Sequence, residues 1–148
     1  TASGCHILSA IRELIGLPKA IRSAVVSPNG MQFSLVFEYD NFNMVFEEMN
    51  DQEIVEFDEA IEIYQGDRKM LLEYDTPYIR YLPSKLTVSE LDCGQAKTTV
   101  YGPHYHDMFA NELLEFYRCV TTHDTPKCDV FDAAEDVKLY IDVAKMMK

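Results

Sequence analysis

Alternating apolar and polar positions dominate the first two thirds of the chain, which is the pattern of β-strands with one buried face. The strongest run covers 31–39, where Phe33, Leu35 and Phe37 share one side of the strand. A strand over 43–49 runs back beside it, so the two runs predict a hairpin. Similar alternation predicts further strands over 19–27, 57–64, 69–74, 85–91 and 96–101.

Apolar residues spaced three and four apart predict three helices. The first lies within 1–16. The second covers 107–122, and its apolar side should lie on the core of the domain. Gly102-Pro103 is expected to end the strand before this helix and to set its entry. The third helix runs to the end of the chain from Asp129, which is a good N-cap residue.

The predicted order is one helix, six to eight strands and two helices, which is typical of an α+β fold. We therefore expect a single domain over 1–148, with an open, predominantly antiparallel sheet and helices packed on one face. Several strands carry apolar residues on both sides, for example Val36 beside Phe37 and Val45 beside Phe46. The second sheet face would then be uncovered, and the pattern predicts that it is an interface between subunits or domains.

The composition narrows the expected partners. The 148 residues are 47% hydrophobic and carry a formal net charge of −12. Nucleic-acid binding depends on clustered Lys and Arg, and the 13 basic residues here are scattered, so nucleic acid is not an expected partner. No apolar run approaches the roughly 20 residues of a membrane span, so membrane association is not expected either. The four cysteines form no C-x-x-C pair and indicate free thiols in a reducing, cytoplasmic setting.

Two places carry side chains suited to chemistry. Tyr101, His104, Tyr105 and His106 precede the second helix, and their rings could stack on and hydrogen-bond to a hydroxylated substrate, although a solvated helix entry explains them equally well. A helix start would splay the two histidines apart, so no metal site is predicted there. His6, in the first turn of the first helix, is the candidate acid or base. The sequence holds no G-x-G-x-x-G and no P-loop.

Several segments together resemble one protein family. Residues 3–18, SGCHILSAIRELIGLP, resemble the segment D-x-G-x-H-x-x-D and the short helix ending in L-x-G-x-P that open the C-terminal domain of the glucose–fructose oxidoreductase / inositol dehydrogenase / MocA family. Residues 109–116, FANELLEF, resemble its aromatic-x-x-E-L-x-x-F helix, and Thr125-Pro126 with 132–134 match its run into the last helix. Residues 61–66, IEIYQG, fit a hairpin of its open sheet. The resemblance covers nearly all of the chain.

This resemblance implies a role. The chain would be the substrate-binding and oligomerisation domain of an oxidoreductase that uses NAD or NADP and acts on a sugar, a polyol or a related small molecule. The cofactor would be bound mainly by an N-terminal Rossmann domain that this sequence does not contain, so the chain alone is not expected to be active. The family's histidine corresponds to His6. Its sheets pack face to face in dimers or tetramers, which agrees with a homo-oligomer formed through the uncovered sheet face.

Two positions depart from the family pattern. Ala2 stands where the family has its first Asp, and Ser9 stands where it has the later one. Without the first Asp, His6 lacks the carboxylate that would orient it. A second interpretation therefore stays open, in which the chain is a non-catalytic dimerisation or ligand-binding sheet domain of a divergent, inactive family member. A third is a small-molecule carrier that uses the open sheet face.

Overall fold

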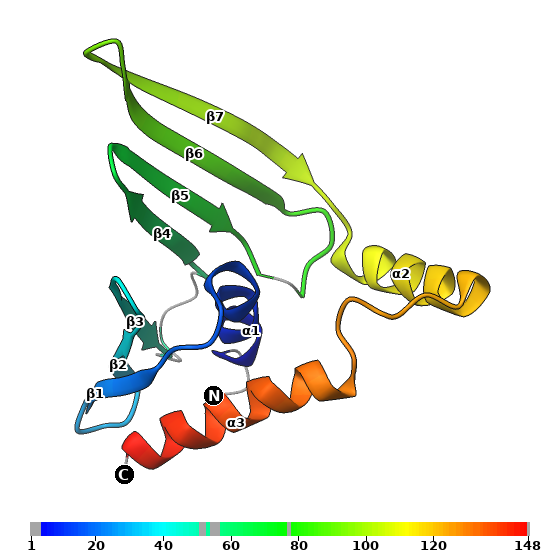
Figure 1. Ribbon diagram of the computed structural model, residues 1–148, viewed down its shortest axis with the longest axis horizontal. Helices are drawn as coiled ribbons and strands as arrows, with labels where there is room; N and C mark the ends of the chain where they lie inside the picture. Colours follow the sequence, from blue (N-terminus) through cyan, green and yellow to red (C-terminus); the bar gives the residue numbers. More distant parts are fainter. Residues whose placement is uncertain (1–3, 51–52, 54–56, 77, 148) are drawn as a thin grey trace. The chain divides into compact units, whose positions relative to one another are not determined.

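The computed structural model describes residues 4–50, 53, 57–76 and 78–147. Its helices and strands are α1 (Gly4–Ile15), β1 (Ala20–Val26), β2 (Gln32–Glu38), β3 (Asn43–Met49), β4 (Glu59–Gln65), β5 (Arg68–Tyr74), β6 (Pro83–Asp92), β7 (Gln95–Tyr105), α2 (Met108–Thr122) and α3 (Val130–Met146) (Figure 1). The chain divides into two compact units. The first comprises Thr1–Ile54 and Lys127–Lys148, and the second comprises Val55–Pro126.

The strands confirm the predicted fold class and differ from the prediction in how they are grouped. Seven strands and three helices make an α+β fold, and all strand pairs in the described residues are antiparallel. The alternation predicts one open sheet, whereas hydrogen bonds join the strands into two sheets with the orders β1-β2-β3 and β4-β5-β6-β7. Each unit therefore contains its own sheet.

The first unit contains the buried core. Leu35 and Phe37 from β2 are fully buried, and Leu8 of α1 and Val143 of α3 are buried as well. The two helices lie side by side, and α3 also packs on β1 (Figure 1). The helices cover the sheet face that carries Leu35 and Phe37. Its other face keeps exposed apolar side chains, among them Val45, as the two-sided pattern of these strands predicts.

Arg12 links the two helices of the first unit. Its Nε atom lies 2.5 Å from Asp136 Oδ1, and its terminal nitrogen NH1 donates to Asp132 Oδ1 at 2.8 Å. The Arg12 side chain is only 12% exposed, so this pairing is partly shielded from water. The hydrogen bond from Arg12 lowers the pKa of the Asp132 carboxyl below its ordinary value. Removal of Arg12 would leave two carboxylates at the α1–α3 contact without their cation.

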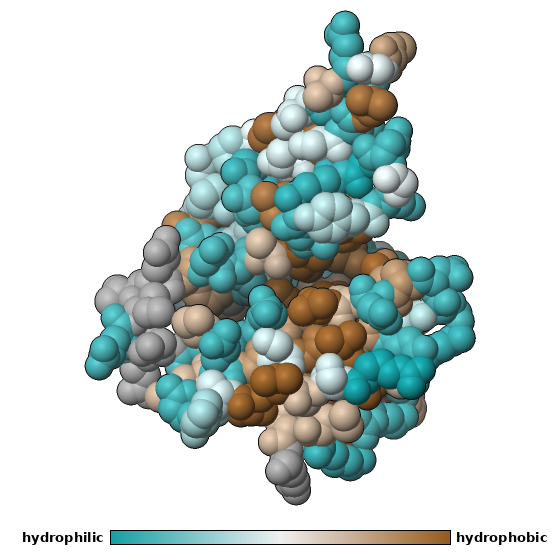
Figure 2. Space-filling model, turned by 90° about the vertical axis from the view of Figure 1, so that its left-hand side faces the viewer, coloured by the Kyte–Doolittle hydropathy of each residue, from teal (hydrophilic) through white to brown (hydrophobic). Residues whose placement is uncertain are grey.

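The second unit lacks a core of this kind. None of its described residues is buried, whereas all seven buried apolar side chains of the described chain belong to the first unit. Helix α2 buries none of its residues, so the expectation that it lies on a core is wrong. Figure 1 shows α2 continuing beyond the end of β7 and not lying across the sheet of its unit. On the face of the molecule seen in Figure 2, brown apolar side chains lie at the surface among teal polar ones.

The expectation that Gly102-Pro103 ends the strand is also wrong, because β7 continues to Tyr105. Proline cannot donate to a strand ladder, but β7 is the edge strand of its sheet, where a missing donor is tolerated. The register shifts between Ser84 and Leu86 of β6, so β7 accommodates an extra residue there as a bulge. Gly102 has a φ of +112°, and a Cβ atom there would lie 2.9 Å from the Ser84 carbonyl oxygen. The bulge therefore needs glycine at this position.

We predict that Arg12→Met lowers the free energy of unfolding by about 2 kcal/mol, because breaking a shielded ion pair leaves its partners uncompensated. The depressed pKa of Asp132 stabilises the fold above the ordinary carboxyl pKa of 3.8, and this contribution disappears as the pH falls through the lower folded-state value. The difference between variant and wild type should therefore shrink in acid. Urea denaturation at neutral and acidic pH measures both effects. Lys145→Met, which removes an exposed pair with Asp142, is the control and should change stability by less than about 0.5 kcal/mol.

Candidate functional site

The predicted pocket residues lie at the end of β7 in the second unit. Tyr101 pairs with Leu86, and His104 pairs with Ser84, so the bulge at 102–103 brings Tyr101 and His104 onto the same face of the sheet. The His106 ring stacks on the His104 ring with 5.8 Å between their centroids. Tyr105 pairs with Pro83 and therefore lies on the opposite face. His104 and His106 are thus in contact, Tyr101 shares the sheet face of His104, and Tyr105 lies on the opposite face.

A row of four polar side chains crosses the sheet beside this cluster. The register pairs Glu59 with Tyr74, Tyr74 with Ser84, and Ser84 with His104, so all four lie on one face. We call them the polar row. The Tyr74 hydroxyl donates to Glu59 Oε1 at 3.1 Å. Burial, and then the Glu59 charge, raise the pKa of the Tyr74 phenol well above its ordinary value. The phenol therefore stays protonated and acts as a hydrogen-bond donor.

The same sheet face is apolar on the other side of Tyr101. We call this the apolar face, and its members are Ile61, Ile63, Met70, Leu72, Leu86 and Val88, with the ring of Tyr101 at its margin. None of these side chains is buried. The reverse side of the sheet is charged, with ion pairs between Lys69 and Glu62 and between Lys85 and Glu73. The six apolar-face side chains are half-buried, whereas Tyr64 and Val100 on the reverse side are exposed.

The start of α2 is held next to this cluster. The Asp107 carboxylate accepts a hydrogen bond from the Ala110 backbone N–H at 3.1 Å and so caps the helix. Arg80, in the segment between β5 and β6, lies 3.6 Å from the same carboxylate. Cap and ion pair together fix where the helix begins.

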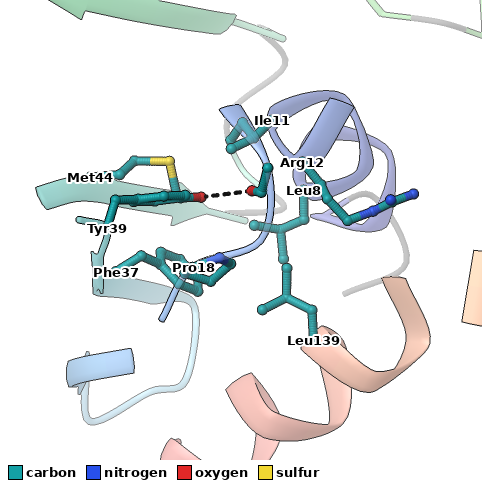
Figure 3. A pocket seen from close by; sticks show the side chains of 9 residues that line it. Leu8, Ile11, Arg12, Pro18, Phe37, Tyr39, Met44 and Leu139 are labelled. Atoms are coloured by element: carbon teal, nitrogen blue, oxygen red, sulfur yellow. Dashed lines mark hydrogen bonds between the residues drawn. The ribbon is translucent and has the colours of Figure 1, made fainter. Parts of the chain in front are cut away.

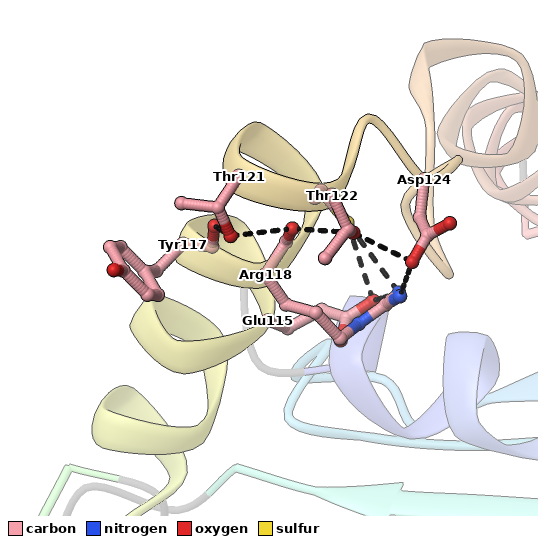
Figure 4. Close-up of polar contacts among 7 residues, drawn as sticks. Glu115, Tyr117, Arg118, Thr121, Thr122 and Asp124 are labelled. Carbon is pink, nitrogen blue, oxygen red and sulfur yellow. Dashed lines mark hydrogen bonds and ion pairs between the residues drawn. The ribbon is translucent and has the colours of Figure 1, made fainter.

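Polar groups at the other end of α2 bond to one another (Figure 4). Arg118 forms a two-pronged contact with Glu115 at 2.7 and 2.9 Å and also pairs with Asp124. Thr122 donates to the Arg118 carbonyl oxygen at 2.8 Å and lies 2.7 Å from Asp124 Oδ2. Glu115, Arg118 and Thr122 lie on the polar side of the helix, so this network leaves the apolar side free for other contacts.

His6 belongs to the first unit and is exposed in the first turn of α1, where the sequence predicts it. It lies two positions from buried Leu8, which in a helix turns it to the opposite, solvent side. No hydrogen bond to His6 is found within the described residues. The predicted site residues are therefore divided between the two units, with His6 in one and the Tyr101–His106 cluster in the other.

A narrow crevice in the first unit does not provide an alternative ligand site. Apolar side chains of α1, β2 and α3 line most of it, and the Tyr39 hydroxyl donates to the Gly16 carbonyl oxygen at 3.2 Å (Figure 3). The crevice has no room even for a water molecule, whereas small-ligand pockets enclose roughly 300 Å³ or more. We interpret this crevice as part of the core.

Among the residues that the structure describes, no three His, Cys, Asp or Glu side chains lie together as metal ligands would. The cysteines Cys93, Cys119 and Cys128 are free thiols, as the sequence predicts. No helix in the described ranges is both long and apolar enough to cross a bilayer. What the cluster offers is hydrogen-bond donors and acceptors beside an aromatic ring.

Sequence reasoning missed Glu59, Tyr74 and Ser84. They lie on three different strands, and only the pairing register brings them level with His104. The alternation within each strand indicates the face of a side chain but not its neighbours on the next strand.

Comparisons with known proteins give one kind of match. No protein-family model matches the chain, and no curated protein sequence matches it. A solved structure from Bacillus subtilis, described as the "putative oxidoreductase yvaA", matches with a TM-score of 0.72 and 13% sequence identity. The match covers 97% of this chain and 48% of that one, so this chain spans about half the length of its structural neighbour. At this identity the match shows a shared fold.

We predict that Tyr74→Phe reduces the loss of stability in alkali. A raised phenol pKa stabilises the fold below the ordinary value of 10.0, and this contribution is lost as the pH rises through the folded-state value. The free energy of unfolding should fall more steeply above pH 10 in the wild type than in the variant. Tyr78→Phe, at an exposed position, is the control and should retain the wild-type slope. If the free energy of unfolding fell as steeply above pH 10 in Tyr74→Phe as in the wild type, the raised pKa of the Tyr74 phenol would be contradicted.

Proposed function

We propose that this chain is the substrate-binding and oligomerisation domain of an NAD- or NADP-dependent oxidoreductase of the glucose–fructose oxidoreductase / inositol dehydrogenase / MocA family. The main support is the fold match over 97% of the chain to about half of a protein described as an oxidoreductase. The family itself is suggested only by the sequence resemblance at 3–18 and 109–116.

The proposal assigns the nicotinamide cofactor to a domain outside this sequence. Dinucleotides are typically held where a glycine-rich turn joins parallel strands to a helix. The strand pairs of the described residues are antiparallel, and the sequence holds no G-x-G-x-x-G. The residues of this chain therefore do not fit that kind of cofactor site, and its own part in the reaction is limited to the substrate.

Within this proposal, His6 is the base that accepts the proton of the substrate hydroxyl, for which an imidazole is well suited near neutral pH. Tyr101, His104 and His106 would contact substrate hydroxyl groups by hydrogen bonding and stacking. Tyr105 lies on the reverse side of the sheet, and we propose it as a contact only for a ligand that reaches that side.

The competing proposal is a non-catalytic sheet domain. Two observations favour it: Ser9 stands at the later Asp position of the family pattern, and His6 is exposed without a hydrogen-bond partner among the described residues. A base without an orienting group is a weaker catalyst. The two proposals differ in whether the full-length protein oxidises a substrate.

We predict that full-length protein reduces NAD or NADP in the presence of at least one sugar or polyol. His6→Gln should lower kcat by at least about a hundredfold, the lower range for loss of a general base, with little change in KM. Glu13→Gln, an exposed position on the same helix, is the control and should retain activity. If the protein turned over substrate and His6→Gln left kcat unchanged, His6 would be ruled out as the catalytic base. Failure to bind either dinucleotide would rule out the oxidoreductase.

We also predict that the chain self-associates through the apolar face. Leu86→Lys should dissociate the oligomer, because a buried unpaired charge is costly. Thr87→Lys, the next residue of the same strand on the charged side, should leave the oligomer intact. Each chain carries a formal charge of −12, so added salt should strengthen association by screening repulsion. Sedimentation equilibrium measures all three, and a wild-type monomer at every concentration would contradict the interface.

A further inference from the structure

The turn between β1 and β2 contains the one step of the sequence at which glycine follows an asparagine or an aspartate. This step is Asn29-Gly30, and both residues are exposed. The backbone nitrogen of a residue can attack the side-chain amide of a preceding asparagine, and glycine hinders the approach least because it has no Cβ atom. A Cβ atom at Gly30 would meet nothing within 4 Å, so the surroundings leave the approach open as well.

The reaction at this step is a deamidation that needs no cofactor. The Gly30 nitrogen forms a bond to Cγ of Asn29, the bond from Cγ to Nδ2 breaks, and ammonia leaves with the proton of the Gly30 N–H. Water then opens the cyclic imide at one of its two carbonyl groups. The product is aspartate or isoaspartate, and either adds one negative charge to a chain that already carries −12.

The folded turn holds both reacting groups in hydrogen bonds. The Gly30 N–H donates to the Ser27 carbonyl oxygen at 2.8 Å, which closes a β-turn. The Asn29 amide oxygen lies 2.6 Å from the Ser27 hydroxyl, which donates to it, and accepts from the Met31 N–H at 3.1 Å. The same hydroxyl accepts from the Gln32 N–H at 3.0 Å. Ring closure therefore requires the turn to open first.

We propose that Asn29 is a deamidation site whose rate of conversion is set by how often the β1–β2 turn opens. Local opening of this kind is a normal motion of exposed turns. The site lies in the first unit and does not depend on the proposed oxidoreductase activity.

The isoaspartate product does not fit the turn that the asparagine forms. Its backbone runs through the former side chain and is longer by one methylene group. The turn is closed at its base by a hydrogen bond of 2.8 Å from the Ser27 N–H to the Gln32 carbonyl oxygen. Strand β2, which starts at Gln32, carries the fully buried Leu35 and Phe37. Conversion would thus loosen the hairpin that supplies the centre of the core.

The experiment incubates the folded protein, and the same protein denatured in urea, at one mildly alkaline pH. Peptide mapping by mass spectrometry follows the mass gained at Asn29. Conversion should be at least about tenfold faster in urea, because the folded turn must break several hydrogen bonds before it reacts. Asn41, which is exposed and precedes Phe42, is the internal control and should stay intact in both samples. An Asn29 that stays intact in urea would overturn the site, and equal rates in the two samples would overturn the role of the turn.

A matched pair of variants tests the turn within the folded protein. Ser27→Ala removes the hydroxyl that bonds to Asn29 and Gln32, so conversion in the folded protein should become about threefold faster or more, with the rate in urea unchanged. Ser23→Ala, at an exposed position of β1, is the control and should keep both wild-type rates. If Ser27→Ala left the folded rate unchanged or lowered it, control by turn opening would be overturned.

Discussion

Burial of apolar surface is the constraint on which the arrangement of this chain depends. The first unit satisfies it internally, since α1 and α3 cover the sheet face that carries Leu35 and Phe37. The second unit has a helix whose apolar stripe is exposed and a sheet whose apolar side is half-buried. Each exposed apolar side chain forgoes on the order of 1.5–3 kcal/mol that full burial would provide. The second unit therefore lacks the internal core that the first unit has.

Local patterns predicted what local forces decide. The hairpin of β2 and β3 follows from strict alternation, and the start of α3 follows from the side chain of Asp129, which accepts hydrogen bonds from the Phe131 and Asp132 backbone N–H groups at 2.9 Å. These features need only a few neighbouring residues. The position of His6 in the first turn of α1 belongs to the same class.

The failures have physical reasons. In the sequence, Gly102-Pro103 predicts the end of a strand. The strand continues because it lies at the sheet edge, where proline is tolerated, and because a bulge accommodates the extra residue. The apolar residues of α2 predict a contact with the core. Their spacing, however, shows only that one side of the helix is apolar and not what covers that side. The polar row depends on pairing across four strands, which no single strand encodes. The sequence predicted the site residues at the end of β7, whereas Glu59, Tyr74 and Ser84 could be found only from the pairing of the strands.

Association and ligand binding would be coupled by the position of the polar row. It crosses the sheet next to the apolar face, with Tyr101 and Leu86 in the adjoining row of residues. A partner that covers the apolar face also removes water from one side of Tyr74 and His104. Hydrogen bonds and charges act more strongly where water is excluded. The hydrogen bond from Tyr74 to Glu59 would then be stronger in the oligomer than in the single chain, and a hydroxylated ligand would meet a more rigid set of donors and acceptors there.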